Sequence, residues 1–461
     1  MRFAIYEKSP IFLQNIFCSF YGYLESKKRF NKDFKDSLSS LLESDFYSAD
    51  EIDECKKKLI TASLLNAKKS GLYTSLNHVS EEDVVREPYI VLRSLPILTK
   101  DDLRTLDLSK IKSGDKLQTV VTSGTTGKAL KLVREAKCFA IQWAVWFRHR
   151  YRFGIKKGDV SVNFSGKPLV PVSQKSPPYW RYNAPMKQHL ISMQHINDNT
   201  IAPIVEFLNT VRPSFYSGYP SIVSEVARLA LSKGLTLEAE ATPQVVFTGA
   251  EKLLGYQKQA IKEWLGPNVV VTDQYGLTEG NCNFSQCEAG NYHEDFEFSH
   301  IEIVDGVINS DGSTTGRLIG TTLHNKAFPL IRYDTGDIAT MASADFKCEC
   351  GRSSRVILEV DGRSDDFVLL PNNQRVMRFD YLFKDTYEVI EAQVIQSERH
   401  VIDIKAVLAE KGNKHAFEEK VEGHFREYIS NDIKLRFNYV DMIEKTATGK
   451  FKAVLNKLDL P

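Results

Sequence analysis

Three short β-branched runs constrain the fold most strongly, because each leads directly into a turn rich in glycine, hydroxyl or acidic residues. The runs and their turns are 119–121 with 122–128, 245–247 with 248–251, and 269–271 with 273–279. Such runs alternating with helical segments indicate an α/β fold with a mostly parallel sheet. Because ligands bind beyond the carboxyl ends of strands in open α/β sheets, we expect the three turns to converge on one crevice.

The domain organisation predicted from the pattern is unequal. Residues 1–361 form a large N-terminal domain, of which 1–115 is helical, and 362–461 form a small mobile α+β domain. The acidic segments Asp50–Asp53 and Ser80–Asp83 indicate helix starts, because negative charge suits a helix N-terminus. A helix is also expected from Pro220 to Gly234. In the small domain we expect strands at 392–395 and 402–408 and a helix at 415–429.

Charge and cysteine content exclude several classes of protein. Lys and Arg number 60 against 59 Asp and Glu, so nothing favours non-specific nucleic-acid binding. The seven cysteines are odd in number and sparse, which indicates a reducing, cytoplasmic location rather than a disulfide scaffold. The apolar stretch 10–24 is too short to span a membrane and is expected to form an amphipathic helix packed on the body, with peripheral membrane contact as the alternative.

The first turn has the chemistry of a phosphate-binding loop. Gly124 and Gly127 let the backbone approach an anion, and the hydroxyls of Ser123, Thr125 and Thr126 supply donors. It is not a Walker A loop, which needs four residues between its glycines and Ser or Thr after the lysine. Taken alone, the segment would be better explained as an ordinary surface turn.

Three further segments point to a nucleotide. Tyr333–Asp337 places two carboxylates around a glycine turn, an arrangement able to accept hydrogen bonds from ribose hydroxyls. Gly362–Asp366 lies at the predicted hinge. Lys450 follows Gly449 near the carboxyl end, and a lysine on such a loop can be brought to a phosphate and withdrawn.

In order and spacing, these segments resemble the adenylate-forming superfamily of acyl-CoA synthetases, nonribosomal adenylation domains and luciferases. Within it, the chain is similar to the phenylacetate–CoA ligase branch and its capsular-polysaccharide-type, coenzyme F390 synthetase-like proteins. The residues that carry this closer resemblance are Ser9–Asn15, Pro177–Asn183, Gly218–Ser221 and Gly449–Val454. The resemblance covers nearly the whole chain.

The resemblance implies a role for each motif residue. The β- and γ-phosphates of ATP would lie on Ser123, Gly124, Thr125, Thr126, Gly127 and Lys128. Gly249, Ala250 and Glu251 would line the adenine side, with Tyr275 and Gly276 facing adenine and the acyl substrate. The catalytic residues would be Thr278 and Glu279, which place the α-phosphate and Mg²⁺, and Lys450, which bridges the carboxylate and the α-phosphate. Asp337 would bind the ribose, with Arg363 beside it, and Asp365 would be the hinge.

The implied activity is that of an AMP-forming carboxylate ligase. It would activate a carboxylic acid as acyl- or aryl-AMP, release pyrophosphate and transfer the acyl group to CoA or to an amine or hydroxyl in polysaccharide or amide biosynthesis. The chain departs from the family at Ala129 and Leu130 after the phosphate loop, and it lacks the usual glycine just past the hinge. The second departure leaves the CoA acceptor open.

A metal site is indicated by a Cys-x-Cys pair, Cys348 and Cys350, together with Cys287 and His293. Thiolate and imidazole donors suit tetrahedral Zn²⁺ in a closed structural site. Similar proteins of the phenylacetate–CoA ligase branch can carry such a metal, and Cys282 is a spare candidate. The alternative is a buried Cys287 beside a reduced, metal-free pair.

Several alternatives remain at this level. The chain could be an acyl-protein synthetase, a P-loop-like kinase or NTPase, or a catalytically silent scaffold. His189 and His195 could line an acyl pocket or simply pack. The aromatic residues between 139 and 151 have helical spacing and are expected in the core. Neither the acid nor the oligomeric state, monomer or homodimer, follows from the sequence.

Overall fold

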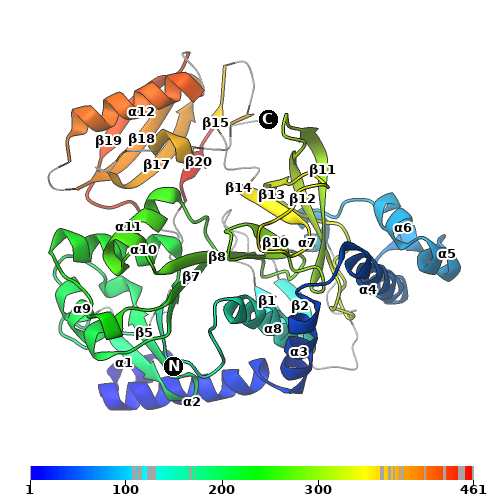
Figure 1. Cartoon of the computed structure of the whole chain (residues 1–461), viewed down its shortest axis with the longest axis horizontal. Coiled ribbons are helices and arrows are strands. Elements are labelled where there is room, and N and C mark those ends of the chain that lie inside the picture. The colour runs from blue at the N-terminus through cyan, green and yellow to red at the C-terminus, as the bar shows by residue number, and fades with distance from the viewer. Residues whose placement is uncertain are drawn as a thin grey trace. The chain divides into compact units, whose positions relative to one another are not determined.

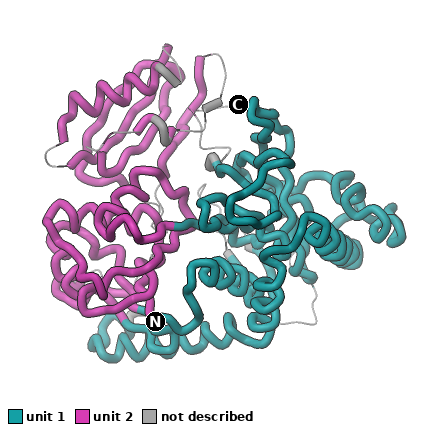
Figure 2. Tube along the Cα trace, in the orientation of Figure 1, with its two compact units in different colours: residues 1–159, 182–188, 272–360 teal, residues 160–181, 189–271, 361–461 magenta. Residues whose placement is uncertain are grey.

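The computed structural model divides into two compact units (Figure 2). Unit 1 contains Met1–Asp159, Tyr182–Gln188 and Thr272–Val360, and unit 2 contains Val160–Arg181, His189–Val271 and Asp361–Pro461. The residues described are 2–105, 111, 117–121, 131–165, 169–171, 173–363, 368–371, 375–376, 379–383, 386, 389–409, 412–428, 432–444 and 452–458. The domain boundary expected between residues 361 and 362, and the mobility expected of the domain that follows it, stay predictions.

Unit 1 begins with a series of helices (Figure 1). They are α1 Arg2–Lys8, α2 Ile11–Arg29, α3 Lys32–Ser44, α4 Ala49–Ser70, α5 Glu81–Arg86, α6 Pro88–Ser94 and α7 Lys100–Thr105. The two predicted starts are confirmed: Ser48 caps α4 through a capping box with Glu51, and Ser80 accepts a hydrogen bond from Asp83 N at the start of α5. Among the described residues, we find no helix with the length and apolar character needed to cross a membrane.

The first β run does not join a parallel sheet. β1 Leu117–Val121 pairs antiparallel with β2 Lys131–Glu135 in a separate two-stranded sheet, which is followed by α8 Ala136–Arg152. The expectation that all three turns follow parallel strands is therefore wrong for the first turn. Two neighbouring segments that can pair locally as a hairpin satisfy each other's backbone groups without a long crossover.

The remaining strands of unit 1 are adjacent in the order β11-β12-β13-β14-β10-β9-β8. Most of β8 Val270–Gly276 belongs to this unit, and it pairs antiparallel with β9 Asn283–Gln286. The others are β10 Tyr292–Glu294, β11 Ser299–Ile308, β12 Thr314–Thr322, β13 Tyr333–Met341 and β14 Val356–Arg363. Antiparallel pairing of β9, β10 and β14 brings together the segments that carry the Cys/His set: Cys287 follows β9, His293 lies on β10, and Cys348 and Cys350 precede β14.

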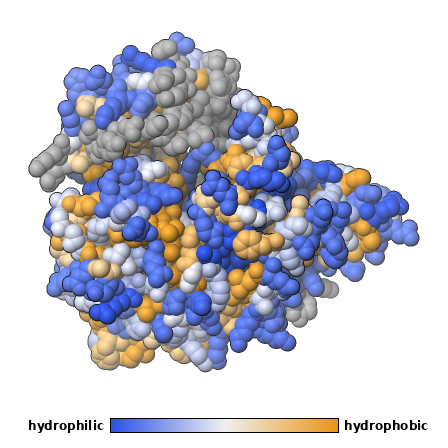
Figure 3. All heavy atoms as spheres, viewed as in Figure 1, coloured by the Kyte–Doolittle hydropathy of each residue, from blue (hydrophilic) through white to orange (hydrophobic). Residues whose placement is uncertain are grey.

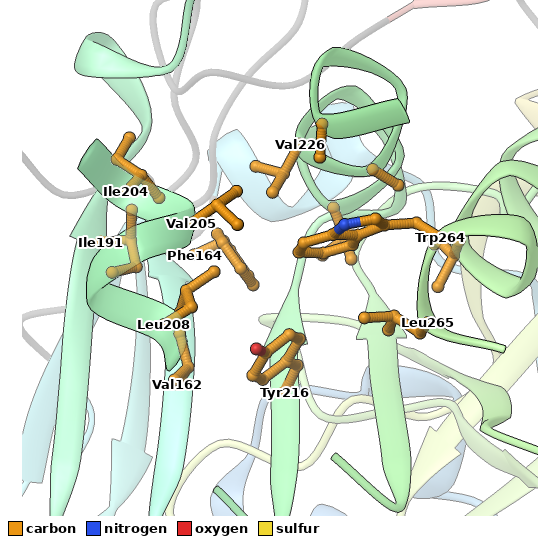
Figure 4. Close-up of a cluster of buried hydrophobic side chains, with 14 of the residues drawn as sticks. Val162, Phe164, Ile191, Ile204, Val205, Leu208, Tyr216, Val226, Trp264 and Leu265 are labelled. Carbon is orange, nitrogen blue, oxygen red and sulfur yellow. The ribbon is translucent and has the colours of Figure 1, made fainter. Parts of the chain in front are cut away.

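Unit 2 contains parallel strands, one of which includes the predicted run 245–247. β3 Ser161–Ser165, β6 Phe215–Gly218 and β7 Val245–Gly249 pair in parallel, and β4 Trp180–Asn183 and β5 Gln188–Ser192 contribute residues to both units. Helices α9 Ile201–Thr210, α10 Pro220–Ser232 and α11 Gly255–Leu265 supply a core with Phe164, Tyr216 and Trp264 (Figure 4). The predicted helix starting at Pro220 is confirmed.

The C-terminal part of unit 2 has its own four-stranded sheet in the order β19-β18-β17-β20. The strands are β17 Val389–Glu398, β18 Val401–Leu408, β19 Lys434–Tyr439 and β20 Val454–Asn456, next to the short pair β15 Val368–Leu369 and β16 Arg375–Val376. Helix α12 Lys414–Tyr428 contributes Phe417, Val421 and Phe425 to the core of this sheet. The strands and helix predicted here are confirmed.

Candidate functional site

The centre of the candidate site in unit 1 is a hydrogen bond between Tyr275 on β8 and Asp337 on β13. The phenol of Tyr275 donates to Asp337 Oδ2, and its ring stacks on Phe284 with centroids 4.7 Å apart and an interplanar angle of 10°. Burial, followed by the nearby charge of Asp337, raises the pKa of Tyr275 well above its ordinary value. The phenol therefore stays a donor, and the stack fixes the plane of the ring.

The glycine turn in β13 separates the two carboxylates predicted from the motif. Gly336 has a φ of 76°, and its N–H donates to Asp334 Oδ1 at 2.9 Å. Asp334 also forms an ion pair with Arg317 at 2.6 Å, so it is committed to a structural partner. Asp337, 9% exposed, is the carboxylate that the turn places beside Tyr275.

Glycine at position 276 is explained by close packing. A Cβ on Gly276 would come within 2.7 Å of Asn283 Oδ1, so a larger residue would displace that side chain. Asn283 in turn donates to Asp295 Oδ2 at 2.5 Å. The residue type predicted from the motif is therefore required by the local structure, whatever ligand lies nearby.

Beyond β8, the chain turns through Thr278 and Glu279 before β9. Thr278 is exposed, and Glu279 lines a small cavity in unit 1 together with Arg134, His324 and Asn325. Arg134 Nη1 donates to Gln142 Oε1 at 3.1 Å. The cavity therefore combines a carboxylate oxygen, which is a hard donor of the kind Mg²⁺ prefers, with a guanidinium.

Sequence reasoning missed the residues that surround Glu279, because they come from three separate segments. Arg134 lies on β2 and Gln142 on α8, whereas His324 and Asn325 follow β12. A signal was available only for Arg134, a basic residue on the strand that follows the glycine-rich loop.

In unit 2 the predicted turn after β7 has a strained backbone. Gly249 ends β7, and Ala250 has a φ of 67°, in the left-handed region that residues other than glycine rarely adopt. Glu251 Oε2 accepts a hydrogen bond from Ser221 N at 3.3 Å, at the start of α10. The carboxylate of Glu251 thus complements the positive end of that helix.

The four predicted metal ligands lie together in unit 1. The ligating atoms of Cys287, His293, Cys348 and Cys350 are all within 4.8 Å of one another. Cys287 Sγ and Cys348 Sγ are 3.7 Å apart, and Cys350 Sγ is 3.2 Å from His293 Nε2. Two sulfurs bound to one tetrahedral zinc ion at about 2.3 Å would be separated by about 3.8 Å, so the donor set fits Zn²⁺.

Two tight turns present the cysteines. Gly290 N donates to Cys287 O at 2.9 Å, and Gly351 N donates to Cys348 O at 3.0 Å. Gly290 and Gly351 have φ values of 84° and 79°, a conformation that glycine adopts without strain. Gly290 and Gly351 therefore permit the tight turns that bring the sulfurs together.

The protonation of these groups fits a bound cation. Burial raises the pKa of Cys287 to about 12, so this thiol ionises only when a positive charge lies beside it. Burial, with Arg152 second, lowers the pKa of His293 to about 4, which leaves the imidazole neutral. A neutral imidazole and a thiolate are the forms that bind metal.

Two polar residues that the sequence reasoning missed orient the ligands. His293 Nδ1 lies 3.2 Å from the carbonyl oxygen of Ser354, which favours the proton on Nδ1 and directs Nε2 toward the sulfurs. Asn291 Nδ2 donates to Cys348 Sγ at 3.3 Å. The position of Asn291 in the sequence, between the ligands Cys287 and His293, could have indicated this orienting role.

Comparisons with known proteins show which proteins this chain is similar to. The family model of the CapK C-terminal domain matches residues 370–457. Protein CapK of Staphylococcus aureus is 25% identical, covering 98% of this chain and 99% of its own length. Phenylacetate–coenzyme A ligase of Thermus thermophilus is 26% identical over 60% of this chain and 62% of its own length.

A solved structure shows the same fold. It is 2-hydroxyisobutyryl-CoA ligase in the postadenylation state with 2-HIB-AMP, which matches with a TM-score of 0.68 over 89% of this chain and 90% of its own, at 15% identity. The chain is a CapK-like member of the adenylate-forming superfamily.

Several of the superfamily motif residues lie outside the described residues. These are the phosphate loop Ser123, Gly124, Thr125, Thr126, Gly127 and Lys128, the hinge residue Asp365 and the lysine Lys450; Arg363 is described only as the last backbone position of β14. Their roles stay predictions. Among the described motif residues, the structure brings Tyr275 and Asp337 into contact.

His189 and His195, the two histidines considered as acyl-pocket residues, both pack against neighbouring side chains in unit 2. His195 is buried, its Nδ1 lies 2.8 Å from Ser192 Oγ, and its ring stacks on Tyr179. His189 makes an edge contact with Phe207. In α8 of unit 1, Phe147 lies in the core, as predicted for the aromatic run.

Proposed function

We propose that this CapK-like protein activates a carboxylic acid as an acyl or aryl adenylate, with release of pyrophosphate, and transfers the acyl group to a nucleophile. The nucleophile is the thiol of CoA, or an amine or hydroxyl of a sugar, amino acid or carrier. The observation that carries the proposal is the pairing of Tyr275 with Asp337, which places a carboxylate beside a fixed aromatic ring in a fold of adenylate-forming ligases.

The chemistry follows from charge. The carboxylate of the acid attacks the α-phosphate of ATP, so two anions must approach, and pyrophosphate leaves as the acyl–phosphate bond forms. Lys450 would place a positive charge between the two anions during this step. Mg²⁺, when bound near Glu279, would supply further charge neutralisation. A carboxylate nucleophile has no proton to lose, so this half-reaction requires no general base.

Asp337 would hold the ribose of the nucleotide. A carboxylate accepts hydrogen bonds from both hydroxyls of a ribose, and the donated hydrogen bond from Tyr275 fixes its orientation. Because Asp334 is paired with Arg317, the motif offers Asp337 for this role. Gly276, the residue after Tyr275, lets the strand backbone lie close to Asn283.

We also propose that Cys287, His293, Cys348 and Cys350 hold a structural zinc ion. All four positions of a tetrahedral ion are taken by the protein, which is typical of structural rather than catalytic zinc. The site would join the segment between β9 and β10 to the segment before β14. It would therefore stiffen the sheet that carries Tyr275 without taking part in the reaction.

The test is a pyrophosphate-exchange assay with a panel of carboxylic acids, using wild type, Asp337→Asn and Lys450→Ala. A hydrogen bond to a charged group contributes about 1.5–3 kcal/mol, so Asp337→Asn is expected to reduce exchange at low ATP by about 10- to 100-fold. Asp311→Asn is the matched control, because Asp311 bonds Ser313 in an exposed turn of the same unit. The proposal fails if no acid supports exchange, or if Lys450→Ala exchanges as wild type does.

The acceptor is identified in a second assay. The acid that supports exchange is incubated with ATP and either CoA, hydroxylamine or amino-sugar and amino-acid candidates, and the acylated product is identified by mass spectrometry. Release of AMP with an acyl-CoA product supports a CoA ligase. An acylated amine or hydroxyl formed without CoA supports the polysaccharide or amide alternative.

A further inference from the structure

Helix α2 packs against the rest of unit 1 with its small and polar residues. Gln14, Cys18 and Gly22 are the buried positions of α2 and recur every four residues, so they form one stripe of the helix. Gly22 lies so close to Asn183 that a Cβ at this position would overlap the side-chain oxygen. The helix backbone therefore approaches the protein closely along this stripe.

Hydrogen bonds made by Asn15 and Ser19 fix the same orientation of α2. Asn15 Oδ1 accepts from Tyr182 N at 2.9 Å, and Ser19 Oγ donates to Tyr182 O at 3.2 Å while accepting from Ala184 N at 3.1 Å. These bonds satisfy backbone groups of the segment that begins at Tyr182, which belongs to the same unit. Rotation of the helix would break these three hydrogen bonds.

The large apolar side chains of α2 consequently point to solvent. Phe12, Ile16 and Phe20 are 63%, 55% and 61% exposed, and Phe17, Tyr21, Tyr23 and Leu24 of the same helix are also exposed. Of the twenty large hydrophobic side chains exposed among the described residues, eight lie between Ile5 and Leu24. Figure 3 shows hydrophobic surface along the lower edge of the view, where α2 lies in Figure 1. A contiguous apolar patch of this kind marks an interaction surface.

The charges at the edge of this outward face are positive. Lys27 and Lys28 are exposed at its C-terminal end, and Lys27 Nζ lies 4.6 Å from the centroid of the Tyr23 ring. Glu25 is the only acidic residue of α2; its side chain is mostly covered and pairs with Lys28 and Arg29. An aromatic and aliphatic face bordered by lysines is the pattern of helices that lie in the interface of an anionic membrane.

We propose that the outward face of α2, comprising Phe12, Ile16, Phe17, Phe20, Tyr23, Leu24 and Lys27, docks this protein on the surface of an anionic phospholipid bilayer. The aromatic and aliphatic side chains enter the boundary between headgroups and acyl chains, and the lysines contact the headgroup phosphates. The helix lies in the plane of the membrane and does not cross it.

A second copy of the chain is a poorer occupant of this face. A two-fold pairing with parallel α2 helices would bring Lys27 and Lys28 of the two copies against each other. An antiparallel pairing would place these lysines near the N-terminal end of the other copy, where Glu7 and Lys8 are both exposed and their charges offset each other. A bilayer with anionic headgroups offers the complementary charge that neither pairing supplies.

The test is flotation of the full-length protein with vesicles of phosphatidylcholine, with and without phosphatidylglycerol. We expect binding to the phosphatidylglycerol vesicles that weakens at high salt. Phe12→Ser with Phe20→Ser should reduce this binding about tenfold or more, because the apolar contribution is lost. Val307→Ser with Ile308→Ser, which alters two side chains that are 68% and 75% exposed on β11, should bind as wild type does.

A charge variant separates the two contributions. Lys27→Gln with Lys28→Gln should lower binding to the anionic vesicles about tenfold. Lys57→Gln with Lys58→Gln on α4, where both lysines are exposed, is its control. Thermal unfolding of each variant reports whether the fold is retained.

Failure of the wild type to float with phosphatidylglycerol vesicles would overturn the proposal. So would a Phe12 and Phe20 variant that binds as tightly as wild type. Sedimentation of the wild type as a dimer that the same variant dissociates, without vesicle binding, would assign this face to a subunit interface instead. None of these outcomes depends on adenylate formation.

Discussion

Replacement of Cys348 by serine tests the proposed metal centre most directly. Cys348 Sγ lies 3.7 Å from Cys287 Sγ and accepts a hydrogen bond from Asn291, so its loss removes one ligand and one orienting contact together. A metal ion present at about 1,000 times its dissociation constant adds about 4.1 kcal/mol to the free energy of unfolding. For a unit of roughly 150–250 residues, each kcal/mol corresponds to about 2–4 °C, so the melting temperature should fall by roughly 8–16 °C.

Two measurements check this expectation. Elemental analysis of protein purified without chelator should find about one zinc ion per wild-type chain and little in Cys348→Ser, because a structural site needs its four ligands. Cys55→Ser, which alters a half-buried thiol outside the cluster, should keep both the metal and the melting temperature. The reasoning is refuted if the wild type holds no stoichiometric metal, or if Cys348→Ser loses its metal and melts as wild type does.

Further predictions concern packing and pH. Gly22→Val should destabilise unit 1 by about 1–3 kcal/mol in chemical denaturation, because the new side chain overlaps Asn183; an unchanged midpoint would mean that α2 does not pack as described. Burial raises the pKa of Asp45, but Arg152, Arg148 and Arg352 together outweigh it and hold the value at about 2. Because the folded-state pKa lies below the unfolded value, this contribution of about 2 kcal/mol is complete above about pH 4 and is lost as the pH falls toward 2. Asp45→Asn should therefore flatten the dependence of stability on pH in that window.

The sequence allowed much of the fold to be predicted, but only where local pattern decides the structure. The acidic first turn of α4, the proline that starts α10 and the strand β18 each depend on nearby residues, and each prediction was confirmed. The pairing of β1 was not predictable in this way. A β-branched run indicates a strand, yet it does not indicate whether its partner is the next segment or a distant one.

The candidate site, too, could be predicted only in part. Cysteine and histidine are rare enough for the metal ligands to stand out, and the structure brings all four together. Ser354 and Arg134 are common residue types in unremarkable positions, so only the folded chain places them beside His293 and Glu279. The sequence does not distinguish the roles of the two carboxylates in the β13 motif. The structure does, because Arg317 forms an ion pair with Asp334.

The orientation of α2 shows most clearly why periodicity alone was insufficient. A helical repeat of apolar residues indicates that a helix has two faces, and the usual expectation is that the apolar face lies against the protein. Here the side with the smaller residues provides the closer packing, because Gly22 allows the backbone to approach Asn183. The stripe of Gln14, Cys18 and Gly22 was visible in the sequence as a second repeat of four. A small-residue stripe opposite an aromatic one therefore indicates that the aromatic face is available to a partner, and for α2 the bordering lysines favour an anionic bilayer.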